Sequence, residues 1–441
     1  MIPGRRLSVS LLAFVLALAA GCGGDEDSAI RPPTHADTVP TTPPLATTPP
    51  LATTTPPLAT TTQPRGSTTA PPPSTSTLPP APPLETTEPE PQPRPRSDTP
   101  LVVGAVDDAA RHPGPVLGQL AEAGFGALAI TSYWDPGRTR PTRAELGVLR
   151  DVARRARARD LRLFLSVFHR GSSTTPLTPA ARAQFAAYTA AIVRELPAIR
   201  DVIVGNEPNV NRFWQPQFEP DGRSAAAPAY LALLAQVYDA VKEVDTDVFI
   251  WGGALGPRGS DRPAGVRPTH SPGRFIRALG AALRASGRAR PVLDGFAYHP
   301  YPETSSTPPD LPHPNPRSRT IGLADDSRLK ELLREAFGRE LPILYSELGV
   351  ETVIPAAKAR LYQGMEPAQP VDEASQADFY RRALELAACQ NGIVGMLLFH
   401  SHDEPSLIGF QSGVYYVDGT PKSSLPAVRD AILAARAGCV R

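Results

Sequence analysis

The sequence predicts that residues 99–441 form an α/β protein, a (β/α)8 or TIM barrel. Short apolar runs rich in β-branched residues alternate here with stretches of Ala, Arg and Leu that are typical of helices. The runs lack the strict polar alternation of half-exposed strands, which indicates parallel strands buried on both faces. Eight strand–helix units over this length fit one barrel with long loops rather than two small domains.

Helix signals follow the expected strands. Thr142 and Glu145 form the pattern of a capping box, and Thr178 caps another helix with Pro179 in its first turn. Two more helices are expected over residues 373–388 and 424–435. A doubly wound sheet is the competing topology, but no Gly-rich phosphate loop follows the first strand. The expected strands are Leu101–Val106, Gly126–Thr131, Leu161–Phe168, Asp201–Gly205, Asp247–Gly252, Val292–Tyr298, Pro342–Ser346 and Ile393–Phe399.

The composition excludes several classes of protein. The 441 residues carry 45 basic and 44 acidic side chains, and this balance gives no field that would steer the chain onto nucleic acid. The three cysteines lack the Cys/His spacing of a zinc site. We expect a monomer without metal or other cofactor and without a nucleic-acid partner.

The N-terminus has the features of an export signal. Arg5 and Arg6 precede Leu7–Ala20, an apolar stretch that is short for a membrane span. The stretch ends in Leu-Ala-Ala-Gly before Cys22, which resembles the lipobox of bacterial lipoproteins. We expect residues 1–21 to be a signal peptide and Cys22 to carry a lipid that anchors the exported protein to the outer face of the cell membrane. Ordinary secretion is the alternative.

Residues 22–98 are expected to form a disordered tether. They consist mainly of Pro, Thr, Ser and Ala, and a short Pro-Pro-Leu-Ala-Thr-Thr motif recurs in them. Such a composition cannot bury a core and favours extended polyproline-like conformations. The segment would hold the barrel away from the membrane, and a Pro-rich ligand for a partner protein is the alternative.

Cys389 and Cys439 are expected to form a disulfide. Cys389 closes the helix before the eighth strand, and Cys439 follows the last helix. In a barrel these two helices are neighbours that run in the same direction, so the cysteines should meet at the end of the barrel opposite the mouth. Export would place them in an oxidising compartment.

Two carboxylates stand at the ends of expected strands. The carboxyl ends of the strands form the mouth of a (β/α)8 barrel, where catalytic groups lie. Glu207 follows the fourth strand and Glu347 follows the core of the seventh, so the two should face each other across the mouth. Cleavage of an acetal needs two facing carboxyl groups, one protonated to release the leaving group and the other ionised.

Other side chains follow the strands at the same end. Aromatic rings there could stack on sugar faces, and their location makes Trp134, Trp214, Phe399 and Phe410 the candidates. His400, His402, Asp403 and Glu404 could suggest a metal site. Adjacent residues of one loop rarely converge on one ion, so we interpret them as solvated charges on a rim loop.

The Asn-Glu-Pro after the fourth strand and the Glu after the seventh resemble clan A glycoside hydrolases, which include the cellulase-like family five and the xylosidase-like family thirty-nine. The resemblance covers residues 101–424 and implies a retaining hydrolase of β-linked glycosides that works through a covalent glycosyl-enzyme. It implies that Glu207 is the acid/base and Glu347 the nucleophile. The implied sugar- and nucleophile-contacting residues are Asn206, His169, His299 and Tyr301, of which the tyrosine touches the nucleophile.

Two departures from the family pattern leave other functions open. Ala129 stands where the family carries a strand-two arginine, which Arg138 or Arg140 could replace from the following loop. Phe399 and His400 replace the tryptophan after the eighth strand. A non-catalytic carbohydrate-binding surface lipoprotein is therefore the main alternative. A transporter's solute-binding lipoprotein is a second one, although it would need two lobes joined by a hinge.

Overall fold

A computed structural model describes residues 100–439, and these residues form a closed barrel of eight parallel strands. Each strand pairs with the next along the chain, and the last pairs with the first. This order excludes both the doubly wound sheet and the two-lobed transporter protein. The predicted signal peptide, the predicted tether and the predicted lipidation site at Cys22 lie outside the described residues. The strands are β1 Val102–Val106, β2 Ala127–Trp134, β3 Arg162–His169, β4 Asp201–Val204, β5 Phe249–Leu255, β6 Gly295–Tyr298, β7 Ile343–Leu348 and β8 Ile393–Phe399.

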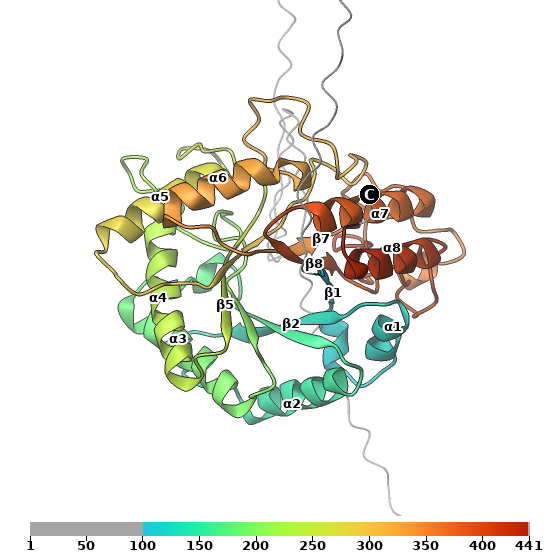
Figure 1. Cartoon of the computed structure of the whole chain (residues 1–441), viewed down its shortest axis with the longest axis horizontal. Helices are drawn as coiled ribbons and strands as arrows, with labels where there is room; N and C mark the ends of the chain where they lie inside the picture. Colours follow the sequence, from blue (N-terminus) through green and yellow to red (C-terminus); the bar gives the residue numbers. More distant parts are fainter. Residues whose placement is uncertain (1–99, 440–441) are drawn as a thin grey trace, which may run out of the picture. The chain divides into compact units, whose positions relative to one another are not determined.

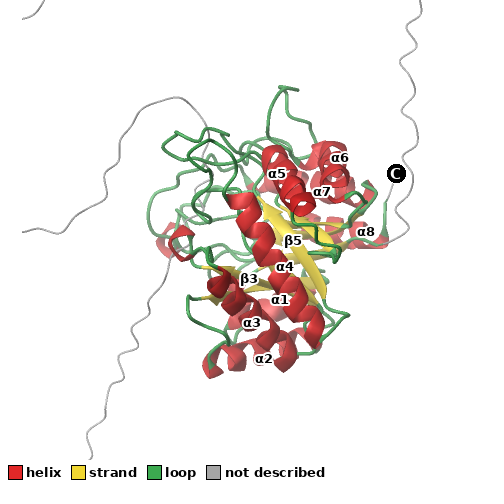
Figure 2. Ribbon diagram, turned by 90° about the vertical axis from the view of Figure 1, so that its left-hand side faces the viewer, coloured by secondary structure: helices red, strands yellow, loops and turns green. Residues whose placement is uncertain are grey.

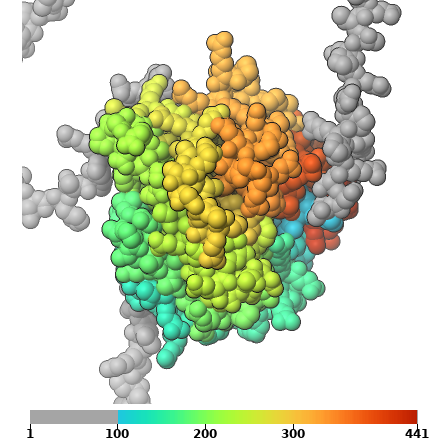
Figure 3. Space-filling view, turned by 60° about the vertical axis from the view of Figure 1, so that its left-hand side comes forward, coloured from blue at the N-terminus to red at the C-terminus, as the bar shows by residue number. Residues whose placement is uncertain are grey.

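Eight α-helices surround the strands in the described part of the chain (Figure 1). Figure 2 shows the strands enclosed by these helices, and in Figure 3 the side chains of neighbouring helices form a continuous surface on one side. No described helix is both long and apolar enough to cross a membrane. The α-helices are α1 Val116–Glu122, α2 Arg143–Arg157, α3 Pro179–Glu195, α4 Ala226–Val244, α5 Pro272–Ala285, α6 Asp326–Phe337, α7 Glu373–Cys389 and α8 Leu425–Ala437, and the short 3-10 helices are η1 Asp108–Arg111, η2 Ser172–Thr174, η3 Leu323–Asp325 and η4 Ala359–Leu361.

The predicted N-caps are present, but one capping box is only half formed. The side chain of Thr142 accepts a hydrogen bond from the backbone N–H of Glu145, and Thr178 caps α3 in the same way. The Glu145 carboxylate does not return to the cap. It instead accepts hydrogen bonds from Arg111 at 2.6 Å and from Ser132 at 2.8 Å. Arg111 and Ser132, from other parts of the fold, thus take the place of the Thr142 backbone N–H that a complete capping box would offer to Glu145.

The period of two along the strands sorts side chains between two cores. One face points into the barrel, where Ala127 and Ala129 of β2 meet Phe164, Trp251 and Leu344 from other strands. The other face packs against the helices in a larger core. A side chain at a strand end points to the same face of the sheet as the residue two positions earlier. This alternation decides which residues reach the mouth.

Cys389 and Cys439 form the expected disulfide, with Cα atoms 4.7 Å apart. It links the C-terminal end of α7 to the residues that follow α8, and these two helices pack side by side. The bond closes a loop of 50 residues. It therefore fastens the last strand–helix unit to the barrel, at the end away from the mouth.

Replacing both cysteines with serine should lower the free energy of unfolding by about 2–4 kcal/mol, because the unfolded chain regains the entropy that the closed loop removes. Chemical denaturation followed by circular dichroism measures the change. The wild type under reducing conditions is the matched control and should reproduce the loss. Equal unfolding midpoints for oxidised wild type and the double variant would contradict a stabilising role.

Candidate active site

An unusual turn after β4 aims Glu207 into the mouth. Gly205 and Glu207 both have positive φ, +83° and +38°, and the Glu207 N–H donates to the carbonyl of Ala254 at 2.8 Å. A non-glycine residue in this region of φ is uncommon and is typical of functional sites. A Cβ atom on Gly256 would lie 2.9 Å from Glu207 Oε1, so glycine is needed there to make room for the carboxylate.

His299 joins the two predicted catalytic carboxylates. Its Nδ1 lies 3.1 Å from Glu207 Oε1 and 3.5 Å from Glu347 Oε2. Because both oxygens lie against one nitrogen, they cannot be further apart than about 6.6 Å, the sum of these distances. Both carboxylate side chains are 12% exposed and His299 is 2% exposed. The mouth therefore holds two nearly buried acids bridged by one imidazole.

Tyr301 also approaches the pair. Its hydroxyl lies 3.4 Å from Glu347 Oε2, which is long for an O–H···O hydrogen bond. The resemblance to clan A glycoside hydrolases implied a contact between Tyr301 and Glu347, and the two side chains do lie against each other. At this length the Tyr301 hydroxyl stabilises the charge on Glu347 only weakly.

Burial raises the pKa of Glu347 to about 7. His299 and Tyr301 oppose this shift, and the neighbouring Glu207 adds to it. The pKa of His299 is itself raised, because Glu347 and Glu207 outweigh the opposite effect of its burial. A hydrogen bond from Tyr301 favours the ionised form of Glu347. Burial has the larger effect on the pKa of Glu347, so the net shift is upward.

The strand-two arginine of the resembling family has no counterpart at this carboxylate. Ala129 faces the barrel interior, while Arg138 and Arg140 line a pocket whose walls do not include Glu347. Among residues 100–439, no Arg or Lys forms an ion pair with Glu347, and His299 is its cationic neighbour. A guanidinium beside Glu347 would lower its pKa and oppose the effect of burial. Because no guanidinium of the described residues lies there, the pKa of Glu347 stays high.

This raised pKa predicts the acidic limb of the pH profile. Glu347 must be ionised to attack, so kcat/KM should rise as the pH approaches about 7 and fall about tenfold per pH unit below the limb. The limb belongs to the coupled carboxylates rather than to one residue. Initial rates on an activated aryl glycoside between pH 4 and pH 9 measure it. A limb near pH 4.5, the ordinary value for glutamate, would contradict the role that burial has here.

Asn206 and His169 lie at the strand ends where the sequence predicted them. Asn206 is half-buried beside Glu207, and its side chain makes no hydrogen bond to the described residues, which leaves its amide available to a ligand. His169 donates from Nδ1 to the carbonyl of Gly171 at 2.8 Å. Burial lowers the pKa of His169 to about 4, so the ring is neutral and its Nε2 is an acceptor.

The two predicted tryptophan platforms are wrong. Trp134 is 0% exposed, packs against Phe185 of α3 and donates from its indole to the Arg138 carbonyl. Trp214 is 1% exposed and packs against Tyr230 and His169. Neither ring has a free face for a sugar. The cause for Trp134 is that β2 extends three residues further than expected, so alternation turns this ring outward into the helix layer.

Tyr133 takes the position that was predicted for Trp134. It follows Ala127 and Ala129 on the inward face of β2, is half-buried, and meets Phe168 edge to face at 5.0 Å. The alternation of β2 could have identified it from the sequence. At the end of β8, which is separated from β2 by β1 alone, Phe399 packs against Phe410 at 4.9 Å, and each ring is 6% exposed. Phe399 is therefore mainly a packing residue beneath the mouth and exposes little of its ring to a ligand.

The loop after β8 is less solvated than the sequence suggested. His402 bonds to Gln119 at 2.8 Å and stacks on Tyr415. Asp403 forms an ion pair with Lys422 at 2.8 Å, and both side chains are 0% exposed. These contacts fix the loop rather than expose its charges. Within residues 100–439, no group of three or more His, Cys, Asp and Glu side chains is placed to hold a metal ion.

Comparisons with known proteins agree with the fold. No model of a protein family matches the chain, and no curated protein matches it either. A solved family 39 glycoside hydrolase from Bacteroides cellulosilyticus WH2 is 19% identical at a TM-score of 0.55, with 76% of this chain and 64% of that one covered. This chain therefore spans less than two thirds of that protein.

Two further solved structures give the same result. A GH5_18 variant from Streptomyces cattleya, in complex with Manβ1-4GlcNAc, is 16% identical at a TM-score of 0.54, covering 77% and 83% of the two chains. A glucosidase from Croceicoccus marinus is 12% identical at a TM-score of 0.52, covering 76% and 66%. At these identities the similarity shows the fold alone. The chain shares the (β/α)8 barrel fold of these solved glycoside hydrolases.

Proposed function

We propose that this protein is a retaining glycoside hydrolase that cleaves a β-linked glycan or glycoside. The observation that carries the proposal is the pair of nearly buried carboxylates, Glu207 and Glu347, bridged by His299 at 3.1 and 3.5 Å. Carboxyl groups of retaining enzymes lie about 5–5.5 Å apart, and inverting enzymes need about 6.5–9.5 Å to admit a water. The upper bound of about 6.6 Å set by His299 favours the retaining arrangement.

The reaction proceeds by double displacement. Glu347 attacks the anomeric carbon as the protonated Glu207 gives its proton to the departing glycosidic oxygen, which leaves as an alcohol. Glu207, now ionised, removes a proton from water, and the resulting hydroxide displaces Glu347 from the sugar. Substrate that covers the mouth excludes water, and the protons of His299 and Tyr301 then face the carboxylate that bears charge. Asn206 and the neutral His169 supply an amide and an imidazole acceptor for sugar hydroxyls.

A carbohydrate-binding protein without turnover is the second candidate. The raised pKa of Glu347 and the lack of an arginine beside it favour this candidate, because a protonated carboxyl group binds hydroxyls but does not attack. The two functions differ in one measurement. An enzyme releases product from activated aryl glycosides, whereas a binding protein only retains them.

The test is a screen of the full-length protein against aryl β- and α-glycosides at pH 7–8, with proton NMR of the first product formed. We expect release of the aryl group from a β-glycoside and a product that first has the β configuration. Initial release of the α-anomer would refute retention. No turnover of any glycoside, together with measurable binding of sugars, would favour the second candidate.

The cellular location is proposed from the N-terminal sequence. We propose that Cys22 is lipidated and anchors the protein to the outer face of the bacterial cell membrane. Replacing Cys22 with serine should leave the precursor uncut and move the protein out of the membrane fraction. Cell fractionation and gel mobility measure both effects. Unchanged partitioning and size would refute the anchor.

A further inference from the structure

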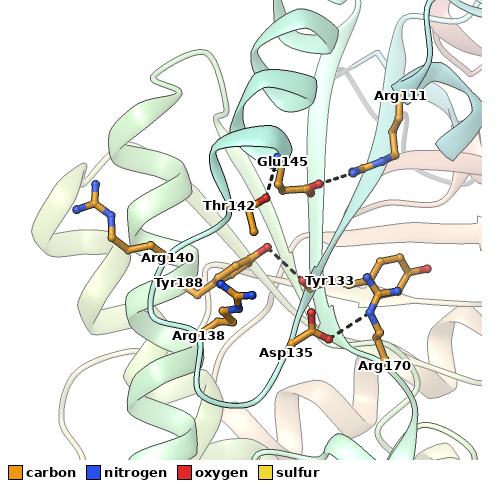
Figure 4. A pocket seen from close by; sticks show the side chains of 9 residues that line it. All are labelled: Arg111, Tyr133, Asp135, Arg138, Arg140, Thr142, Glu145, Arg170 and Tyr188. Atoms are coloured by element: carbon orange, nitrogen blue, oxygen red, sulfur yellow. Dashed lines mark hydrogen bonds and ion pairs between the residues drawn. The ribbon is translucent and has the colours of Figure 1, made fainter. Parts of the chain in front are cut away.

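A pocket beside the mouth gathers four arginines from three segments of the chain (Figure 4). Arg111 comes from η1, Arg138 and Arg140 from the β2–α2 loop, and Arg170 from the loop after β3. Its volume is about 140 Å³. This is enough room for an anionic substituent of a sugar.

Most of the charges in the pocket are already paired. Arg111 binds Glu145 at 2.6 Å, and Arg170 binds Asp135 at 3.2 Å. Arg140 pairs with Glu195, and Figure 4 shows its side chain extending away from the other labelled residues. The guanidinium of Arg138 makes no hydrogen bond or ion pair with any of residues 100–439. The pocket therefore has one positive charge without a counterion.

An aromatic wall connects this charge to the mouth. Tyr133 lines the pocket, and its place on the inward face of β2 also puts it at the mouth beside Phe168. The guanidinium of Arg170 lies 4.5 Å from the centroid of the Tyr133 ring. The Tyr133 hydroxyl makes no hydrogen bond to the described residues. An aromatic face, a free hydroxyl and a free guanidinium together suit a sugar that carries an anionic group.

We propose that this pocket binds the carboxylate or sulfate group of an acidic sugar in the substrate. The inference rests on the proposed function, because it assigns a substrate class to the same mouth. Arg138 pairs with the anion, Arg170 and the Tyr133 hydroxyl donate to its remaining oxygens, and the Tyr133 ring packs on the sugar. Glu145 and Asp135 hold Arg111 and Arg170 in place through ion pairs, and neither carboxylate neutralises the charge of Arg138.

The test compares matched glycans in an uncleaving background. Full-length Glu347→Gln protein is titrated by calorimetry with a β-linked uronic acid oligosaccharide and with the same compound after its carboxyl groups are reduced to alcohols. A sulfated oligosaccharide and its desulfated form make the second pair. We expect the charged member of one pair to bind about tenfold or more tightly, the worth of a charge-assisted hydrogen bond. The pair that shows the preference identifies the anion.

Arg138→Ala in the same background should abolish this preference and leave binding of the neutral glycans unchanged. Arg154→Ala is the matched control, because Arg154 is an exposed arginine of α2 outside the pocket and its loss changes the net charge equally. Equal affinity for charged and neutral members of both pairs would overturn the proposal, as would a preference that survives Arg138→Ala. Wild-type turnover of aryl glycosides is measured separately, so failure of the subsite and failure of the proposed enzyme are distinguishable.

Discussion

Replacing Glu347 with glutamine should reduce hydrolysis of every substrate to background, whatever its leaving group. The amide cannot attack the anomeric carbon, so no glycosyl-enzyme forms and a better leaving group gives no help. The rate of release from aryl glycosides with good and poor leaving groups measures the effect. This is the largest loss of activity that we expect from a single substitution in this protein.

The same variant should keep its fold, which separates lost chemistry from lost structure. The pKa of Glu347 is raised to about 7, so the native state binds its proton more tightly than the unfolded chain does. Stability therefore falls as the pH rises from about 4.5 through 7, and glutamine escapes this loss. At pH 8 the variant should be more stable than the wild type, by up to roughly 3 kcal/mol. A variant that is unstable at pH 8, or one that keeps wild-type activity, would contradict the assignment.

Replacing Glu207 with glutamine should have an effect that depends on the leaving group. Substrates that need protonation should lose about 10²- to 10⁴-fold in kcat/KM, the usual worth of general acid catalysis. Aryl glycosides with good leaving groups should still react with Glu347 and give a burst of product. The glycosyl-enzyme should then accumulate, because no base is left to activate water. Stopped-flow absorbance and mass spectrometry of the intact protein measure the burst and the adduct.

Azide distinguishes the two glutamates. A small anion can enter the space of the Glu207 carboxylate and attack the glycosyl-enzyme without a base. Added azide should restore turnover of Glu207→Gln and yield a β-glycosyl azide, and it should not restore Glu347→Gln in this way. Rescue of the opposite variant, or an α-glycosyl azide from Glu207→Gln, would show that the roles are reversed.

The alternation of apolar runs with helical segments was enough to predict the barrel, because each strand and helix carries its own local period. The positions of Glu207 and Glu347 followed from the same reasoning, since both lie directly at strand ends and all strand ends of a parallel barrel meet at one mouth. The pairing of Cys389 with Cys439 was also predictable, because the topology makes the last two helices neighbours.

The tertiary structure decided what depends on register and on contacts between distant segments. β2 extends to residue 134, and with a period of two this placed Tyr133 at the mouth and Trp134 among the helices. The pKa of Glu347 depends on desolvation and on the charges around it, which no local pattern contains. The arginine pocket joins three loops whose proximity only the closed barrel creates. Local sequence thus determined the elements and the candidate catalytic pair, while packing determined which neighbours each side chain meets and how strongly its charge is stabilised.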